Sequence, residues 1–288
     1  FANCTTLTNV YFNAEKCETA SGVVKGVVHG PFEGCNALAG VTFDDKATII
    51  PAYVFKDCGA LRRAAIGEKS KCTMIGAHAF ENCVSLPNIR ISEYIDVVGE
   101  YAFYNTGITK FSVHSFMKEI GVGAIGGCKN LANVSCKKDN DNFVLKDGML
   151  FTKEFDRVIF CPAGKAPATL NLAEMPITTI DDGAFKYCTN LVTVTLPGTV
   201  NYIGKEAFFN CIKLKTFFIP SPEMPTCPGP IFDKKAKENA ELKVGPGTVM
   251  TYLNHEYWKG FKNTGETFAP TYEIKYEYDN SGAGKKKK

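Results

Sequence analysis

The sequence predicts a repeat solenoid that consists mostly of short β-strands and turns, and three observations carry this prediction. A motif with the pattern Phe-x-x-Cys-x-x-Leu recurs along the 288-residue chain. Each copy is followed by alternating apolar residues, which is the period of a strand with one buried face. Several copies are 23 positions apart, and a unit of that length can bury a core only by stacking on its neighbours.

The copies of the motif cover most of the chain. Eight of them begin at Phe1, Phe32, Phe55, Phe80, Phe103, Ile125, Phe185 and Phe208. The departures from the pattern are Thr106 in place of Cys, Ile125 in place of Phe, Ala64 in place of Val, and a degenerate turn at Pro51. Since the copies stay in phase despite these changes, we expect residues 1–220 to form one array of eight repeats.

Each repeat is expected to contain one strand and one turn. The strand follows the Leu of the motif, as in the alternation of Val194 and Leu196. An apolar residue followed by Gly precedes most copies, as at Ile75-Gly76 and Ile203-Gly204. We interpret this Gly as part of a tight turn that a side chain would block.

An insertion and a closing segment complete the predicted organisation. The first residues of the sixth and seventh copies are 60 positions apart, so 37 extra residues interrupt the array, and we predict a hairpin insertion at residues 137–175. Residues 221–264 are predicted to cap the last rung with Tyr252, Tyr257, Trp258 and Phe261. Residues 265–288 are either a tail or the start of a further module.

Three stretches of the chain resemble a known family. They are LPGTVNYIGKEAFFNC (Leu196–Cys211), FVLKDGMLFTKEFDRVIFCPAGK (Phe143–Lys165) and LKVGPGTVMTYLNHEYWKGFKN (Leu242–Asn263). They are similar to the repeat, the hairpin insert and the closing segment of the bacterial surface-protein-A (BspA-like) leucine-rich repeat family. The resemblance implies a curved leucine-rich repeat array and an exported or cell-surface protein of a host-associated microbe that takes part in adhesion. An extracellular or cell-surface location is therefore expected.

The composition limits the classes of partner. The chain has 33 basic and 30 acidic residues and a net charge of +3, which gives no reason to expect nucleic-acid binding. No apolar run approaches the ~20 residues of a membrane span, and no signal peptide is recognisable. Because the chain begins without Met and within a motif, we expect an excised or mature fragment. Its oligomeric state is left open.

No motif in the sequence predicts catalysis, a cofactor or a metal site. The four His residues have neither ligand nor triad spacing, and His78 is expected at the surface. Asp139–Asn142 resembles the start of a calcium loop but is not followed by the required Gly and Glu, so a turn is expected there. The pairs Asp44-Asp45 and Asp181-Asp182 are interpreted as solvated turn residues. We therefore predict a protein that is not an enzyme.

The chain contains 12 Cys residues, and seven occupy the repeat position: Cys4, Cys35, Cys58, Cys83, Cys128, Cys188 and Cys211. Equivalent residues of stacked rungs lie ~4.8 Å apart with parallel side chains, which suits neither a disulfide nor tetrahedral zinc. We expect these seven to be buried thiols that pack as small apolar residues. A core position is expected for Cys136, and an apolar role for Cys161 in the hairpin insert. Whether Cys17, Cys72, Cys161 or Cys227 forms a disulfide is left open.

A binding site is predicted on the exposed face of the strands. Three consecutive rungs each carry one outward cation, and we expect these to act with polar neighbours on a host or microbial surface protein of acidic character. The predicted ligand-binding residues are Arg63, Arg90, Lys110, Asn88, Ser112 and Asn133. Ordinary solubilising charge is an open alternative, as is neutralisation by Glu93, Asp96 or Glu119.

Two other functions are considered. A glycan-binding module needs exposed aromatic side chains on one platform, and Tyr11 and Phe218 are too far apart in the array to form one. A structural spacer that displays further surface domains is the other alternative.

Overall fold

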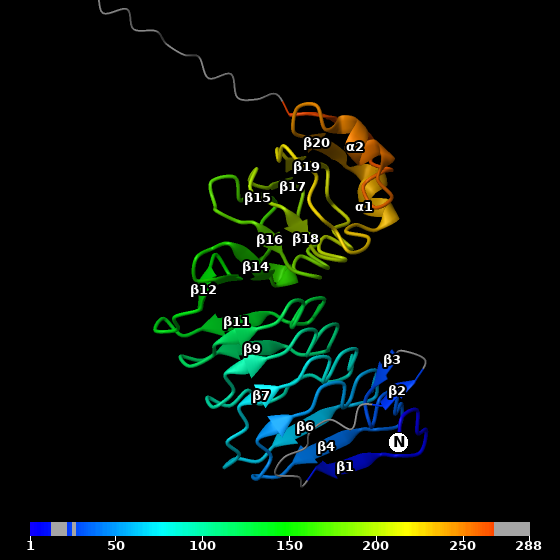
Figure 1. The fold of residues 1–288 in the computed structure, drawn as a ribbon, viewed down its shortest axis with the longest axis vertical. Helices are drawn as coiled ribbons and strands as arrows, with labels where there is room; N and C mark the ends of the chain where they lie inside the picture. The colour runs from blue at the N-terminus through cyan, green and yellow to red at the C-terminus, as the bar shows by residue number, and fades with distance from the viewer. Residues whose placement is uncertain (13–21, 25–26, 268–288) are drawn as a thin grey trace, which may run out of the picture.

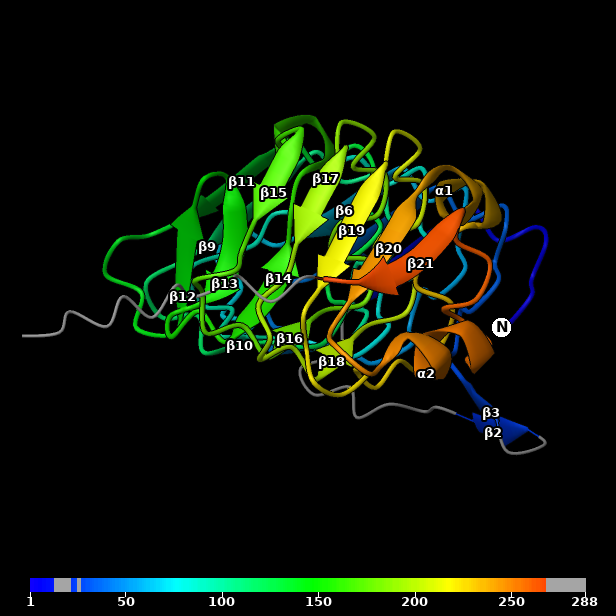
Figure 2. The same cartoon turned by 90° about the horizontal axis from the view of Figure 1, so that it is seen from above.

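The computed structural model describes residues 1–12, 22–24 and 27–267, which form a curved stack of rungs along the long axis of the molecule (Figure 1). Most rungs contribute a strand to a first parallel sheet, a short strand to a second parallel sheet, and a turn to a third side. Figure 2 shows the strands of the two sheets on opposite sides of the stack. The predicted repeat solenoid is therefore confirmed.

The first sheet consists of the strands that follow the Leu of a motif, together with one strand at the end of the insertion and two in the C-terminal segment. These are β1 (Asn9–Phe12), β4 (Gly40–Phe43), β6 (Arg63–Ile66), β9 (Lys110–Val113), β11 (Asn133–Cys136), β15 (Thr169–Asn171), β17 (Thr193–Thr195), β19 (Thr216–Ile219), β20 (Glu241–Val244) and β21 (Asn263–Glu266). They pair in register as three separate groups, β1-β4-β6, β9-β11 and β15-β17-β19-β20-β21. Buried and exposed residues alternate along strands such as β6 and β9, as the period predicted.

The second sheet is formed by the residues that come directly before the Gly of most repeats. Its strands are β5 (Ile49–Ile50), β7 (Met74–Ile75), β8 (Val97–Val98), β10 (Glu119–Ile120), β14 (Arg157–Phe160), β16 (Thr179–Ile180) and β18 (Tyr202–Ile203). This sheet was not predicted, because a strand of two residues is too short to show an alternation. It is divided into a group that ends at β10 and a group that contains β14, β16 and β18.

The glycines after these short strands are required by the neighbouring rung. A Cβ added at Gly76, Gly99 or Gly121 would overlap backbone atoms of the rung before it. None of the three has the positive φ of a left-handed turn. Each of these Gly residues nevertheless begins a turn, such as the one closed by the Ala79 N–H and the Gly76 carbonyl oxygen at 3.3 Å, so the predicted tight turn is confirmed, and the neighbouring rung is what blocks the side chain.

Turns that carry the Phe-x-x-Cys motif form the third side of the stack. The Phe rings lie face to face, with centroids 5.6 Å apart for Phe32 and Phe55 and 5.5 Å apart for Phe80 and Phe103. The residue before each Cys or its equivalent is left-handed, namely Asn3, Gly34, Asp57, Asn82, Asn105, Gly127, Tyr187 and Asn210. Asn, Asp and Gly tolerate this conformation best, so the residue type before the Cys is a signal that the sequence carries.

His78 lies in a ladder of rings on this side and is only partly exposed. Its imidazole stacks between Tyr53 and Tyr101, with centroid distances of 4.5 and 5.0 Å. Its Nδ1 lies 2.7 Å from the Glu81 carboxylate. The expectation of a simple surface position was therefore incomplete, because the ring packs between two rungs.

The insertion places a hairpin between two hydrophobic cores. Strands β12 (Phe143–Lys146) and β13 (Met149–Thr152) are antiparallel, and β14 returns to pair with β16 of the second sheet. A 3-10 turn, η1 (Ala163–Lys165), follows. Leu150 packs into the core of the N-terminal rungs, whereas Met149 and Phe151 pack into the core of the C-terminal rungs. The hairpin therefore separates the two cores.

Smaller elements lie near the ends of the described chain. An antiparallel pair, β2 (Gly22–Val24) and β3 (Val27–His29), follows the first rung. Helices α1 (Lys234–Asn239) and α2 (Val249–Asn254) lie in the C-terminal segment. Asp233 caps α1, since its side chain accepts a hydrogen bond from the Ala236 N–H at 2.9 Å.

The stacking continues into the segment that was predicted to be a cap. Phe232 stacks on Phe208 with ring centroids 5.7 Å apart, so Phe232 acts as the Phe of a further rung, although no Cys-containing motif marks it in the sequence. Tyr252 and Trp258 are fully buried against it, as predicted, and Tyr257 and Phe261 are partly buried. The division into solenoid, cap and tail stays a prediction, and residues 268–288 of the predicted tail lie outside the described residues.

Candidate functional site

The predicted site residues lie on the exposed face of the first sheet. Arg63, Lys110 and Asn133 are the first residues of β6, β9 and β11, and all three side chains are exposed. Ser112 points outward from β9 and is half-buried. Lys110 lies directly opposite Asn133 in the parallel register, and Ser112 lies opposite Ser135. Neighbouring rungs therefore present these groups side by side.

The first sheet is interrupted between β6 and β9, where Asn88 and Arg90 lie. Residues 88–91 form a single bridge, between Ala64 and Ile89, where neighbouring rungs form four-residue strands. Pro87 is the equivalent of Arg62 in the preceding rung. The backbone N–H of Arg62 donates to the Ala39 carbonyl of the rung before it, whereas Pro87 has no N–H group to donate. The ring nitrogen Nε2 of His114 lies 2.8 Å from the Ile91 carbonyl oxygen. The interruption therefore has a local cause in the sequence.

A hollow of about 680 Å³ lies at this interruption. Asn88, Arg90, Lys110 and Ser112 line it together with Glu68 and His114. The small side chains of Ala64 and Ala65, with Ile89, form part of its wall, whereas the equivalent residues of β4 are Val41 and Thr42. Small residues on a rung without a full strand thus produce a depression in the sheet face.

The structure brings four of the six predicted site residues into this hollow and leaves two at its flanks. Asn133 lines the adjoining hollow, which shares Lys110 and Ser112 with the first. Arg63 is exposed on the preceding rung but lies outside both sets of lining residues. The predicted row of residues is therefore a continuous surface with a depression at its centre.

The cations that line or flank the hollow have no ion-pair partner in the described part of the chain. Arg63, Arg90 and Lys110 make no salt bridge there, whereas other cations do, such as Lys118 with Asp96 at 3.0 Å. Asp96 is thus engaged elsewhere, and Glu119 belongs to the second sheet. Asp96 and Glu119 therefore do not neutralise the cations at the hollow.

Acidic groups are still close to the hollow. Glu68 lines it, and Glu93 lines an adjoining depression together with Arg90. Neither makes an ion pair within the described residues. Guanidinium, ammonium, amide and hydroxyl donors therefore face solvent here, and such a set can bind carboxylates.

The repeat cysteines form a ladder of hydrogen bonds between rungs. The thiols of Cys58, Cys83 and Cys128 donate to the carbonyl oxygen of the Phe that begins the preceding repeat, at 3.0 to 3.1 Å. Thr106 replaces Cys in one rung, and its hydroxyl donates within its own repeat, to the Phe103 carbonyl at 2.9 Å. The prediction of purely apolar packing was incomplete, because the small side chain at this position also donates a hydrogen bond to a backbone carbonyl.

The eleven cysteines that the structure describes are free thiols. Cys72 and Cys161 are buried, while Cys136 and Cys227 are half-buried. Cys17 lies outside the described residues.

In the part of the chain that the structure describes, no group of three or more His, Cys, Asp or Glu residues is arranged to hold a metal ion. Asn140 of the calcium-like stretch is fully buried, and its amide donates to the Met117 carbonyl at 3.0 Å.

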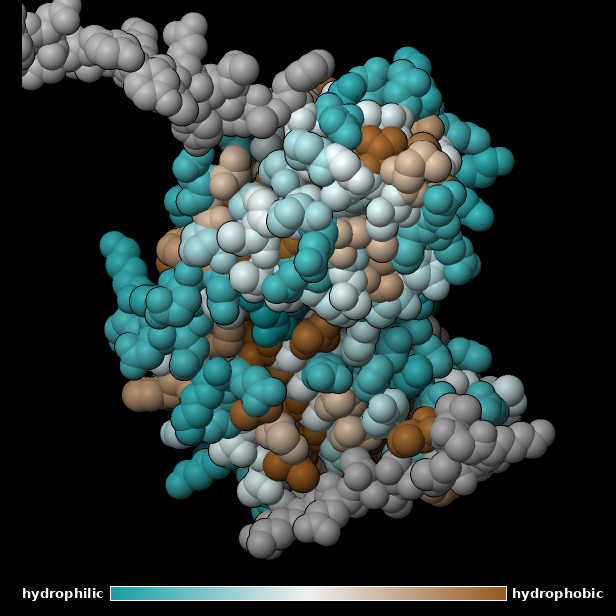
Figure 3. Space-filling model, turned by 45° about the horizontal axis from the view of Figure 1, so that its top comes forward, coloured by the Kyte–Doolittle hydropathy of each residue, from teal (hydrophilic) through white to brown (hydrophobic). Residues whose placement is uncertain are grey.

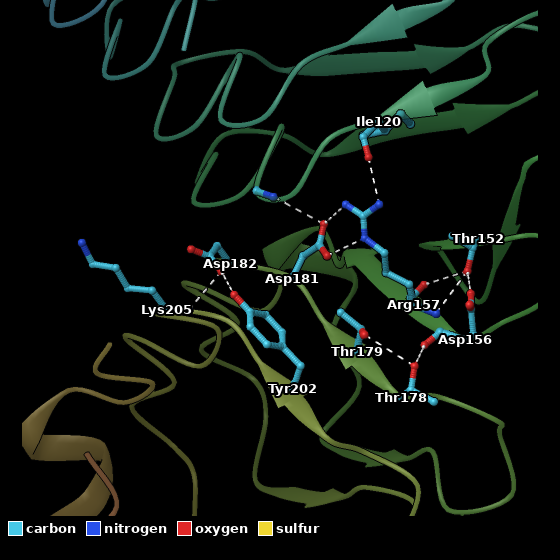
Figure 4. Close-up of polar contacts among 11 residues, drawn as sticks. Ile120, Thr152, Asp156, Arg157, Thr178, Thr179, Asp181, Asp182, Tyr202 and Lys205 are labelled. Carbon is cyan, nitrogen blue, oxygen red and sulfur yellow. Dashed lines mark hydrogen bonds and ion pairs between the residues drawn. The ribbon is translucent and has the colours of Figure 1, made fainter. Parts of the chain in front are cut away.

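A buried polar cluster lies where the array is interrupted, and the sequence interpretation missed it. Asp181 and Asp182 are 0% and 1% exposed, so their assignment as solvated turn residues was wrong. Arg157 from β14 binds Asp181 through two hydrogen bonds of 2.6 Å each and also donates to the Ile120 carbonyl at 3.0 Å (Figure 4). Its guanidinium thereby links β10 to β16 across the gap in the second sheet.

Tyrosine and lysine side chains extend this cluster. Asp182 accepts hydrogen bonds from the Tyr101 hydroxyl and from the Lys205 backbone N–H. Glu206 accepts hydrogen bonds from Tyr104 at 2.7 Å and from Lys186 at 2.6 Å. We call this region, with Arg157 and Asp181, the seam. In the space-filling view a hollow with hydrophobic residues crosses the middle of the molecule between its upper and lower parts (Figure 3).

The fold defines the class of protein. Stacked rungs with an in-register parallel sheet after each Leu place it among the leucine-rich repeat solenoids. A comparison with protein families matches the BspA type leucine rich repeat region over residues 1–132 and 167–241, in six copies. The chain belongs to this family of BspA type leucine-rich repeat proteins.

Solved structures share the fold at low sequence identity. A leucine-rich repeat protein from Eubacterium ventriosum is 17% identical with a TM-score of 0.55, and the match covers 80% of this chain and 73% of that one. A leucine rich cell surface protein from Faecalibacterium prausnitzii is 17% identical with a TM-score of 0.54, over 90% and 88% of the chains. The pneumococcal vaccine antigen PcpA is 16% identical with a TM-score of 0.59, over 90% and 76%.

No match was found among curated proteins. Within the described ranges, no helix is both long enough and apolar enough to span a lipid bilayer.

Proposed function

We propose that this protein is a non-catalytic adhesion protein of a microbial cell surface, and that the first sheet binds an acidic region of a host or microbial protein. Membership of the BspA type family supports a surface role, and one protein of the same fold is described as a cell surface protein. The binding residues are Arg90, Lys110, Asn88 and Ser112 in the hollow. Arg63 and Asn133 extend the surface on either side.

The observation that carries this proposal is the set of unpaired cations at the hollow. Arg90 and Lys110 line one depression and lie without an ion-pair partner among the described residues. Like charges on adjacent rungs repel each other within a Debye length, ~8 Å at physiological salt. A partner that supplies carboxylates offsets this repulsion and forms charge-assisted hydrogen bonds.

Neither alternative function gains support from a specific feature. Tyr11 belongs to β1 and Phe218 to β19, which lie in separate groups of the first sheet, so they form no common platform for a glycan. A spacer gives no reason for unpaired cations to converge on one depression.

The test is a triple Arg63→Ala, Arg90→Ala, Lys110→Ala variant, compared with the parent in adhesion to host cells and matrix proteins. The matched control replaces Lys129, Lys213 and Lys235, which are exposed cations outside the hollow, by Ala. We expect the site variant to lose adhesion and its salt dependence while melting at the parent temperature. Equal loss in the control, or undiminished adhesion of the site variant, contradicts the proposal.

A further inference from the structure

The central hollow does not end at β11 but continues past the hairpin. It shares Lys110 and Ser112 with a second hollow of about 480 Å³, which Asn133 and the hairpin residues Leu145 and Gly148 also line. The second hollow shares Lys165 with a third, also of about 480 Å³. We call these three hollows together the trough. It runs across the strands, along the axis of the solenoid.

The insertion forms the wall of the trough between β11 and β15. Lys146 lies at the end of β12, and Lys165 lies in η1 where the chain leaves the hairpin strands. Both are exposed, and both line the third hollow. Lys165 makes no ion pair within the described ranges. The cations of the trough therefore continue from Arg90 and Lys110 to Lys165.

The far end of the trough has a different character. Leu170, Leu172 and Met175 line the third hollow together with Met149 and Phe151 of β13. Its charged residues are balanced, since Asp147 and Glu174 accompany Lys146 and Lys165. The trough is thus basic at its middle and apolar at the end nearest β15.

We infer that the trough binds an extended acidic segment of a polypeptide, with carboxylates over Arg90, Lys110 and Lys165 and an apolar side chain in the hollow beside β15. This inference rests on the proposed function and assigns the partner's chemistry. From the rung of Ala64 to that of Leu170, including the hairpin, the trough spans five rung steps, or about 24 Å at the usual strand spacing. An extended chain covers that distance with about seven residues.

A polypeptide suits the trough better than an anionic glycan. Both classes of ligand supply negative charges for the middle of the trough. Only a polypeptide combines them on one chain with a branched apolar side chain, which the hollow lined by Leu170, Leu172 and Met175 would accept. Burial of such a side chain adds affinity that does not depend on salt.

The test uses labelled synthetic peptides and fluorescence anisotropy. One peptide has a central run of Glu with Leu at both ends, so that its direction does not matter, and two others carry Ser for Leu or Gln for Glu. A sulfated heparin oligosaccharide is the fourth probe.

The protein variants are Thr169→Trp, which fills the hollow beside β15, and Lys165→Ala. Their matched controls are Thr193→Trp, whose residue lies opposite Thr169 on β17 and outside the hollow, and Lys129→Ala.

The inference predicts a specific pattern of affinities. The Leu-containing acidic peptide should bind the parent most tightly, and Thr169→Trp should weaken it about tenfold to the level of the Ser peptide. Lys165→Ala should weaken both acidic peptides by about threefold, as expected for one exposed charge pair. The two controls should bind like the parent.

Other outcomes overturn the inference in distinguishable ways. If the triple Arg63, Arg90 and Lys110 variant loses adhesion while Thr169→Trp and Lys165→Ala bind every probe like the parent, the proposed function stands and the extension over the hairpin is wrong. If the oligosaccharide binds more tightly than any peptide, and if its affinity is unchanged in Thr169→Trp, the ligand is an anionic glycan. If the parent adheres to cells but binds none of the peptides, an acidic polypeptide is excluded as the partner.

Discussion

At the scale of single residues, the repeat cysteine is a packing group and a hydrogen-bond donor together. Burial raises the pKa of the Cys58 thiol to about 12 and that of Cys128 to about 11. Cys4 belongs to the first rung and differs, because a backbone hydrogen bond from Thr6 holds its pKa below the ordinary value. A thiol reacts as its thiolate, so the ladder is inert except at its first member.

We expect native-state alkylation with iodoacetamide near neutral pH to modify Cys4 first among the described cysteines. Cys58, Cys83 and Cys128 should react only after unfolding, because their thiols are buried and protonated. Peptide mapping after a time course measures the order. Labelling of Cys83 at the rate of Cys4 in folded protein would show that the rungs open locally.

At the scale of elements, side-chain hydrogen bonds connect the rungs at the seam, where the backbone pairing of both sheets stops. Arg157 is the link between β10 and β16, and its partner Asp181 is fully buried. Removing one member of a buried ion pair costs more than replacing both, since the other charge is left unpaired.

Arg157→Met is expected to lower the free energy of unfolding by about 3–5 kcal/mol, because it leaves the Asp181 carboxylate buried without a cation. The double variant Arg157→Met, Asp181→Asn should recover much of this loss. Urea denaturation measures both. Lys118→Met, which breaks the exposed pair with Asp96, is the control and should cost less than about 1 kcal/mol. A loss in Arg157→Met no larger than in the control contradicts a supporting role for the seam.

Among the carboxyls of the seam, Glu206 has a lowered pKa and therefore predicts a local sensitivity to acid. Burial raises the pKa of Glu206, but the hydrogen bonds from Lys186 and Tyr104 outweigh it and hold the pKa below its ordinary value of 4.5. A carboxyl with a lowered folded pKa stabilises the protein above its unfolded pKa and loses this contribution as the pH falls through the folded pKa. Stability measured below pH 4.5 should therefore fall less steeply in Glu206→Gln than in the parent. Glu238→Gln, in an exposed pair on α1, should leave the slope unchanged.

The elements differ in how far the sequence predicts them. Strands such as β6 and β17 follow from alternation, and the Phe stack follows from the phase of the motif. The second sheet could not be predicted, because two residues show no period and their pairing depends on the neighbouring rung. The burial of Asp181 depends on Arg157, which comes from an insertion 24 positions away and gives no local signal.

The candidate site was predictable in part. The outward direction of Arg63, Lys110 and Asn133 follows from the strand period. The interruption at Asn88 and Arg90 has a signal in Pro87, which cannot donate to a neighbouring strand. The approach of Lys165 to the same surface had no signal, because it requires the path of the hairpin.

At the scale of the whole molecule, the protein contains two hydrophobic cores with the hairpin between them. The N-terminal core ends at Phe160, and the C-terminal core contains the only tryptophan, Trp258. Repeat arrays unfold in parts when the interface between neighbouring rungs is weak.

We expect urea unfolding monitored by Trp258 fluorescence to have a different midpoint from unfolding monitored by far-UV circular dichroism. The fluorescence reports the C-terminal core alone, whereas the dichroism reports both cores. Arg157→Met should widen the difference, because it weakens the connection between them. Coincident transitions in the parent and in this variant would mean that the two cores unfold as one cooperative unit.

The seam has a mechanical consequence for the proposed adhesion function. Neither sheet is continuous there, since β10 does not pair with β14 and β11 does not pair with β15. Tension along the long axis is therefore transmitted through the hairpin, the Arg157 guanidinium and single hydrogen bonds such as that from Tyr104 to Glu206, and not through an unbroken ladder of backbone bonds. A steady pulling force should therefore separate the solenoid at the seam first. Two folded parts, each with its own core, would remain, and the molecule would extend before either part unfolds.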